Sequence, residues 1–139
     1  MGRVTTEAII ENLEDVWGVR RGRLAADQVR RLVLANALVD TGAIALSLPT
    51  AMIQQLGLAP VALKDTITAA GPATTTHYEA VRLTIQNRSC TVDVLEVPDK
   101  VPVLIGQIPL EFMDFVVDPG QRRLIGNPDH GGQQVLELL

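Results

Sequence analysis

The chain is poor in aromatic residues and in positive charge, and both shortages limit the partners it can have. Aromatic side chains make up 3% of the 139 residues, and the formal net charge at pH 7 is −4. Proteins that bind nucleic acids present a basic face, often with aromatic rings on which bases stack. We therefore expect no nucleic-acid partner, and a core built from Val, Leu, Ile and Ala.

Cysteine and long apolar runs are also scarce. Cys90 is the only cysteine, which excludes an internal disulfide and a cysteine-rich zinc site. We expect Cys90 to be a small buried residue of a strand. No apolar stretch reaches the about 18 residues needed to span a membrane, and the first residues lack the apolar segment of a secretion signal. We therefore expect a cytoplasmic protein without a membrane partner.

The composition is that of a folded domain. Hydrophobic residues account for 47% of the chain and charged residues for 20%, which is too apolar for a disordered protein. The length allows one core and is too short for two. We therefore assign residues 1–139 to a single domain. Its many short apolar runs, separated by turn residues, predict an all-β barrel or sandwich.

Local signals locate the expected elements. Residues 50–56 have helical composition, with Pro49 at the start and Gly57 at the end. Asn36 predicts a tight connection between two strands, and Gly71-Pro72 predicts a turn. The remaining expected elements are a helical turn at 109–114 and strands at 4–13, 16–19, 29–34, 37–40, 64–70, 74–86, 89–97, 101–105, 115–118, 122–125 and 135–139.

The segment Asp40-Thr41-Gly42 lies between two apolar runs and is the best candidate for a catalytic site. Two neighbouring carboxylates share one proton, so one can act as a base toward water while the other acts as an acid toward a carbonyl oxygen. The glycine leaves room for backbone N–H groups near the carboxylate. The chain has only one such triplet, so a second carboxylate would have to come from a second copy.

These residue types are also common in turns, so the triplet alone is weak evidence. A second apolar run ending in glycine, Leu104-Ile105-Gly106, follows later in the chain. Together with Asp40-Thr41-Gly42-Ala43, it resembles the two signature motifs of retropepsin-like aspartic proteases, in particular their single-domain bacterial members. The resemblance covers most of residues 38–128 and includes Leu48-Pro49, Leu56-Gly57-Leu58, Ile108-Pro109-Leu110 and Val116-Val117-Asp118-Pro119.

The resemblance implies an all-β, closed, barrel-like fold with one or two short helices. It also implies a homodimeric endopeptidase with one active site on its two-fold axis, needing no metal or organic cofactor. Each copy would contribute the catalytic Asp40, and Thr41 would make a hydrogen bond across the dimer. The active-site loop would also contain Gly42 and Ala43. Its support would come from Leu104, Ile105 and Gly106.

A β-hairpin flap over the active site is implied as well, within residues 66–78 and with its tip near residues 70–73. The flap residues are Ala69, Ala70, Gly71, Pro72 and Ala73. The substrate would be an extended peptide or protein segment, paired with the flap backbone as an added strand. By analogy, apolar pocket walls would be Ile44, Ala69, Ala70 and Val103. Residues 1–31 match the family poorly, and we expect them to be either an N-terminal extension or dimerisation strands.

One departure from the family favours a different function. Family members often carry Ser, Thr or Asp directly after Asp-Thr-Gly-Ala, whereas this chain has Ile44. Loss of that polar group favours the alternative of a non-catalytic dimeric β-domain that binds extended peptides. A structural domain within a longer protein is a third alternative, and Met1 counts mildly against it.

Other candidate residues have simpler interpretations. His77 and His130 have no neighbour at metal-ligand spacing, so we expect them at the surface or in turns. Asp114 and Asp118 are not followed by Thr-Gly. We expect Asp114 at a helix end or in a loop, and Asp118 as the first residue of a turn with Pro119 and Gly120. Trp17 is expected to pack against the barrel, with an interface role as the alternative. A basic patch is most simply a solvated face, with a site for phosphate or an acidic partner as the minority interpretation. Its members are Arg20, Arg21, Arg23, Arg30 and Arg31.

Overall fold

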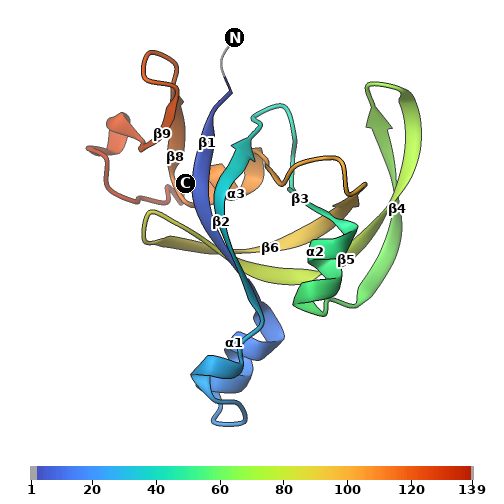
Figure 1. Cartoon of the computed structure of the whole chain (residues 1–139). Coiled ribbons are helices and arrows are strands. Elements are labelled where there is room, and N and C mark those ends of the chain that lie inside the picture. Colours follow the sequence, from blue (N-terminus) through green and yellow to red (C-terminus); the bar gives the residue numbers. More distant parts are fainter. Residues whose placement is uncertain (1–2, 139) are drawn as a thin grey trace.

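The computed structural model describes residues 3–138 and is mostly β-structure with a few short helices (Figure 1). The strands are β1 (Thr5–Asn12), β2 (Arg31–Val39), β3 (Leu46–Pro49), β4 (Pro60–Thr68), β5 (Gly71–Ile85), β6 (Arg88–Val97), β7 (Leu104–Ile105), β8 (Phe115–Asp118) and β9 (Arg123–Gly126). The helices are α1 (Leu13–Arg20), α2 (Thr50–Leu56) and α3 (Gln107–Phe112), with 3₁₀ turns η1 (Ala26–Gln28) and η2 (Pro128–His130). The expectation of a mostly-β protein with a few short helices is confirmed. Among residues 3–138, no helix is long and apolar enough to cross a membrane.

The strands form one large sheet and one small hairpin. The large sheet has the order β1-β2-β7-β3-β6-β5-β4, and β1 also pairs with β5. Six strands therefore form a circuit of pairings, while β4 extends from β5 outside that circuit. The circuit is uneven, because β7 pairs with each neighbour over two residues only, whereas β5 and β6 pair from His77 to Ile85. The structure therefore supports a mostly-β fold, and not an evenly closed barrel.

The inward faces of the strands form one aliphatic core, as the shortage of aromatic residues predicted. The largest fully buried side chains are Ile10, Leu46, Leu48, Ile53, Leu56, Leu83, Ile85, Ile105, Leu110, Met113, Val81 and Val94. Cys90 is 5% exposed and belongs to this core, which confirms its predicted burial. Burial raises the pKa of its thiol to about 11, so the sulfur stays protonated and unreactive at neutral pH.

Helix α1 replaces the predicted strand at 16–19, and that prediction was wrong. Asn12 begins the helix, because its side-chain oxygen accepts a hydrogen bond from the Asp15 backbone N–H at 3.1 Å. Acidic residues occupy the first turn, where the helix dipole favours negative charge. The β-branched residues of this segment therefore lie on a capped helix that packs against β1 and β5.

Two strand boundaries also differ from expectation. Strand β2 runs without interruption through Asn36, where a tight connection was predicted. Pairing with β1 along almost its whole length overrides that local turn signal. The β4–β5 turn lies at residues 69–70, and Gly71 begins β5 with a φ of +113°. This left-handed backbone region is accessible to glycine at little cost.

Other expectations have mixed outcomes. Helix α2 is confirmed, and Gly57 ends it in the left-handed conformation with a φ of +66°. The predicted last strand is absent over residues 135–138, and Leu139 lies outside the described residues. Trp17 is 43% exposed, with the Arg21 guanidinium 5.6 Å from its ring centroid. The tryptophan therefore does not pack fully against the sheet.

Candidate active site

The Asp40 loop follows β2 and is held by strand β7. Strand β7 pairs in parallel with the end of β2 and antiparallel with β3, which follows the loop. The Asp40 backbone N–H donates a hydrogen bond to the Ile105 carbonyl at 2.9 Å, and the Ala43 N–H donates to the Asp40 carbonyl at 3.0 Å. Both ends of the loop are therefore fixed to the same short strand.

Gly106, the last residue of the Leu104-Ile105-Gly106 motif, also holds the Asp40 loop. Its N–H donates to the Ala45 carbonyl at 2.9 Å, and the next N–H, of Gln107, donates to the Ala43 carbonyl at 2.8 Å. A Cβ atom at position 106 would lie 2.5 Å from the Ala45 oxygen and 2.7 Å from the Ala43 oxygen. Only glycine fits this close approach of two backbones. The sequence motif is thus explained by packing, independently of any catalytic role.

The Asp40 side chain is half-buried at the loop surface. Its Oδ1 atom accepts a hydrogen bond from the Gly42 N–H at 3.0 Å. A Cβ atom on Gly42 would lie 3.2 Å from that oxygen, which is tighter than most carbon contacts. Thr41 and Gly42 are exposed. Within residues 3–138, the Thr41 hydroxyl makes no hydrogen bond.

A pocket of about 510 Å³ opens beside Asp40. Its lining comes from the chain start, the end of β2, the loop, and the β8–β9 hairpin. The lining residues are Arg3, Val4, Leu38, Val39, Asp40, Thr41, Val117, Pro119 and Arg122. Asp40 is the only acid among them. Sequence reasoning missed Arg3 and Arg122, because nothing local links these distant positions to the Asp40 motif.

The predicted flap corresponds to the long β4–β5 hairpin, which projects from the sheet separately from the 40–45 loop (Figure 1). Ala69 and Ala70 form its turn, and Gly71, Pro72 and Ala73 begin the returning strand. The Thr68 hydroxyl donates to the Gly71 carbonyl at 2.9 Å and braces the tip. Within the described chain, no hydrogen bond joins this hairpin to the Asp40 loop.

The residues named by analogy as pocket walls do not gather at one place. Val103 is 4% exposed and belongs to the core. Ile44 is 69% exposed on the loop. Ala69 and Ala70 are exposed at the hairpin tip. Within one chain these residues therefore form no common cavity.

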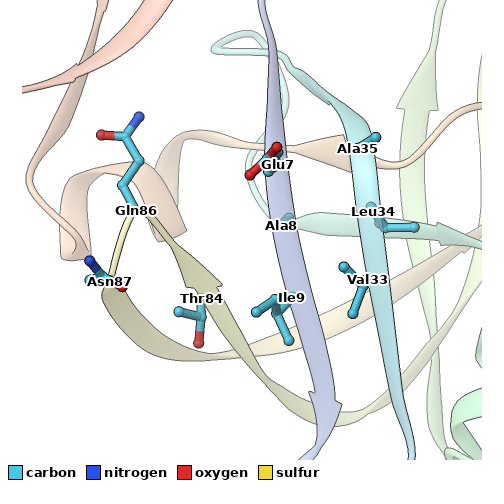
Figure 2. Close-up of a pocket in the computed structure, with 9 residues that line it drawn as sticks. All are labelled: Glu7, Ala8, Ile9, Val33, Leu34, Ala35, Thr84, Gln86 and Asn87. Atoms are coloured by element: carbon cyan, nitrogen blue, oxygen red, sulfur yellow. The ribbon is translucent and has the colours of Figure 1, made fainter.

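A separate hollow lies between β1, β2 and the end of β5 (Figure 2). Val33, Ile9 and Thr84 form a cross-strand row there, as the strand register requires. Glu7 is the only ionisable side chain in its lining. This hollow contains no residue of the two sequence motifs, so it is not the predicted site.

The two histidines are engaged in ion pairs. His77 Nε2 lies 2.9 Å from Asp93, and its Nδ1 is buried without a partner in the described structure. His130 Nδ1 lies 2.6 Å from Asp114. This contact is the main reason why the pKa of Asp114 lies below its usual value and that of His130 above it. Among residues 3–138, no three His, Cys, Asp or Glu side chains come together as a metal site.

A single Asp-Thr-Gly loop, held by a hydrophobic-hydrophobic-glycine strand, defines the retropepsin-like class of proteins. A family model described as aspartyl protease matches residues 31–109, more than half of the 139 residues. This range begins with β2 and contains both the Asp40 loop and its β7 support. The chain therefore belongs to the aspartyl protease family, whose members are peptidases, a class of hydrolase. A search of curated proteins finds no match.

Proposed function

We propose that the chain is a homodimeric aspartic endopeptidase in which Asp40 of each copy forms one catalytic pair. The observation that carries this proposal is the presence of a single acid, Asp40, in the lining of its pocket. The shared-proton mechanism needs two carboxylates at short range. The family shows that the activity is peptide hydrolysis, so the second carboxylate comes from another copy of the chain.

The surface around the loop supports association. The Thr41 hydroxyl is exposed and makes no hydrogen bond within the described residues, so it is available to bond across a two-fold axis. Ile44 and Ile108 are 69% and 55% exposed. They are adjacent, because the Ile108 N–H donates to the Ile44 carbonyl at 3.0 Å. A partner that covers this apolar surface would remove it from water.

The chemistry follows from the sharing of one proton by the pair. The ionised carboxylate takes a proton from water while the water oxygen forms a bond to the peptide carbon. The protonated carboxyl gives its proton to the carbonyl oxygen, which produces a neutral tetrahedral intermediate. Proton transfer to the amide nitrogen then allows the C–N bond to break.

The β4–β5 hairpin is proposed as the flap that binds the substrate backbone. Strand β4 pairs with β5 on one side only, so its outer edge is free to accept an extended peptide. Val61, Leu63 and Ile67 lie along β4, with Asp65 between the last two, and they are 61%, 72% and 90% exposed. This exposed apolar face is suited to contacts with apolar side chains of a substrate.

The test compares wild type with Asp40→Asn on an unfolded protein substrate, from mildly acidic to neutral pH. We expect a bell-shaped pH profile for wild type and a loss of activity of about a hundredfold or more for the variant. Asp27→Asn is the matched control, because Asp27 is an exposed acid of η1 that does not line the Asp40 pocket. Sedimentation equilibrium establishes the concentration at which dimers form.

Mixing the two proteins tests the shared site directly. A heterodimer of wild type and Asp40→Asn holds one carboxylate, so excess variant should suppress wild-type activity. Equal cleavage by both homodimers would show that Asp40 is not catalytic. No cleavage by wild type, at concentrations where it is dimeric, would favour the alternative of a peptide-binding domain. An active monomer would exclude the two-copy mechanism.

A further inference from the structure

A second charged site lies at the other end of β2, around the carboxylate of Glu11. Glu11 is 5% exposed, and both of its oxygens are engaged. Oε1 accepts a hydrogen bond from Arg82 Nε at 2.9 Å and lies 2.7 Å from Arg82 Nη2 in an ion pair. Oε2 accepts one from Arg31 Nη2 at 2.9 Å. A buried carboxylate requires such partners. One arginine would neutralise the charge of Glu11, and the second therefore leaves an excess of positive charge.

A third arginine reaches the same place. The pocket beside Glu11 has a volume of about 260 Å³ and is also lined by Arg20, from the last turn of α1. Within residues 3–138, the Arg20 guanidinium has no hydrogen bond or ion pair. The neighbouring Asp15 does not neutralise the pocket, because it is paired with Arg30. Three guanidinium groups and one carboxylate leave an excess of two positive charges.

The free donors suit a tetrahedral dianion. Arg82 uses Nε and Nη2 on Glu11, and Arg31 uses Nη2. This leaves Arg82 Nη1, Arg31 Nε and Nη1, and all the donors of Arg20 for a ligand. Guanidinium groups bind phosphate oxygens in a fork geometry. A phosphate group carries about −1.5 to −2 charges at pH 7, which matches the excess, whereas a carboxylate carries only one.

We infer that this pocket binds a phosphate group, either as free phosphate or as a phosphate monoester. The remaining wall is apolar and would contact the organic part of an ester. Its residues are Val16, Val19, Ala26 and Val29. Asp40 is absent from the lining, so this site is separate from the peptidase site. Of the basic patch in the sequence, Arg20 and Arg31 belong to this pocket, whereas Arg30 is paired with Asp15.

The test is calorimetric titration of the full chain at low ionic strength, where exposed charges are least screened. The probes are inorganic phosphate, phenyl phosphate and benzoate. Arg20→Gln removes the third cation and leaves both Glu11 ion pairs intact, so we expect about tenfold weaker phosphate binding. Arg23→Gln is the matched control, because Arg23 is an exposed arginine outside the pocket lining.

Glu11→Gln tests the charge argument in the opposite direction. It removes the single negative charge, so the folded variant should bind phosphate more tightly than wild type. Tighter binding of phenyl phosphate than of inorganic phosphate would identify an ester as the ligand, and equal binding would identify the free ion. Three results would each overturn the inference. They are equal effects of Arg20→Gln and Arg23→Gln, binding of benzoate as tight as that of phosphate, and no phosphate binding at millimolar concentration.

Discussion

The segment of residues 13–28 precedes β2 and the Asp40 loop follows it. Different interactions hold these two regions against the rest of the protein. The loop is fixed by backbone hydrogen bonds to β7 and by the close approach of Gly106. The segment, which contains α1 and η1, is fixed by side-chain charges. Arg30 donates to both oxygens of Asp15 in α1 at 2.8 and 3.0 Å. Next to the segment, Glu11 of β1 pairs with Arg31 of β2 and Arg82 of β5.

This difference predicts that the two regions respond differently to pH and salt. Backbone hydrogen bonds and steric fit change little with pH or salt, whereas ion pairs depend on both. The family match begins at residue 31, so the backbone-held loop lies inside it and the whole charge-held segment of residues 13–28 lies outside. A catalytic loop must keep its geometry under all working conditions. The charge-held segment is free to respond to ions.

The largest expected effect is at Gly106. Gly106→Ala places a Cβ atom 2.5 Å from a backbone oxygen, and we expect a loss of about 3 kcal/mol of unfolding free energy together with loss of activity. Gly120→Ala is the control, because its Cβ would meet only ordinary contacts from 3.4 Å. Urea unfolding of both variants measures the difference. Similar stability of the two variants would contradict the steric account.

At the charge-held end, Arg30→Ala should have a smaller effect on stability. It leaves the nearly buried Asp15 carboxylate without its side-chain partner. We expect a loss of about 1–2 kcal/mol, because Arg30 itself is half-exposed. Arg23→Ala, at another exposed arginine close to Arg30 in the sequence, serves as the control. A loss in 1 M salt as large as that in dilute buffer would show that packing, and not charge, holds the segment.

Dimer formation gives the next prediction. If the Thr41 hydroxyl bonds across the two-fold axis, Thr41→Val should weaken the dimer about tenfold while preserving side-chain volume. Thr41→Ser keeps the hydroxyl and should stay close to wild type. Sedimentation equilibrium measures both dissociation constants. Equal constants for the Val and Ser variants would remove this hydrogen bond from the proposed mechanism.

The smallest expected effect is the change in stability at acidic pH. The Arg30 side-chain hydrogen bond holds the pKa of Asp15 below its usual value. A lowered folded pKa gives stabilisation that is present above the unfolded value of about 3.9 and is lost as pH falls through the folded value. The stability difference between wild type and Arg30→Ala should therefore be constant near neutrality and shrink below about pH 4. A stability difference that grew as the pH fell would contradict a lowered pKa of Asp15.

Local signals predicted those elements whose ends are set by their own residues. Pro49 and Gly57 bounded α2 correctly, and Pro119-Gly120 located the β8–β9 turn. Helix α1 was missed because the β-branched residues of 16–19 favour a strand. The stronger signal was the Asn12 cap followed by two acids. Attention to capping would have corrected this prediction.

Elements defined by tertiary pairing could not be bounded from sequence. Strand β7 has two residues, fewer than any periodicity can identify, yet it lies between β2 and β3. Asn36 gave a turn signal that pairing with β1 overrides. The sequence indicated the Asp40 and Gly106 motifs, and the structure brings them together. Arg3 and Arg122 were missed because their shared pocket exists only after folding.

The place of β7 also sets the time at which the peptidase can first be assembled. The loop is complete only when residues 104–106 have inserted between the strands on either side of it. These residues are made after Asp40, because about 60 residues separate the two motifs. A chain still emerging from the ribosome therefore has Asp40 but not the support that holds it in position. The proposed peptidase site is therefore not formed in a chain that has not yet reached residue 106.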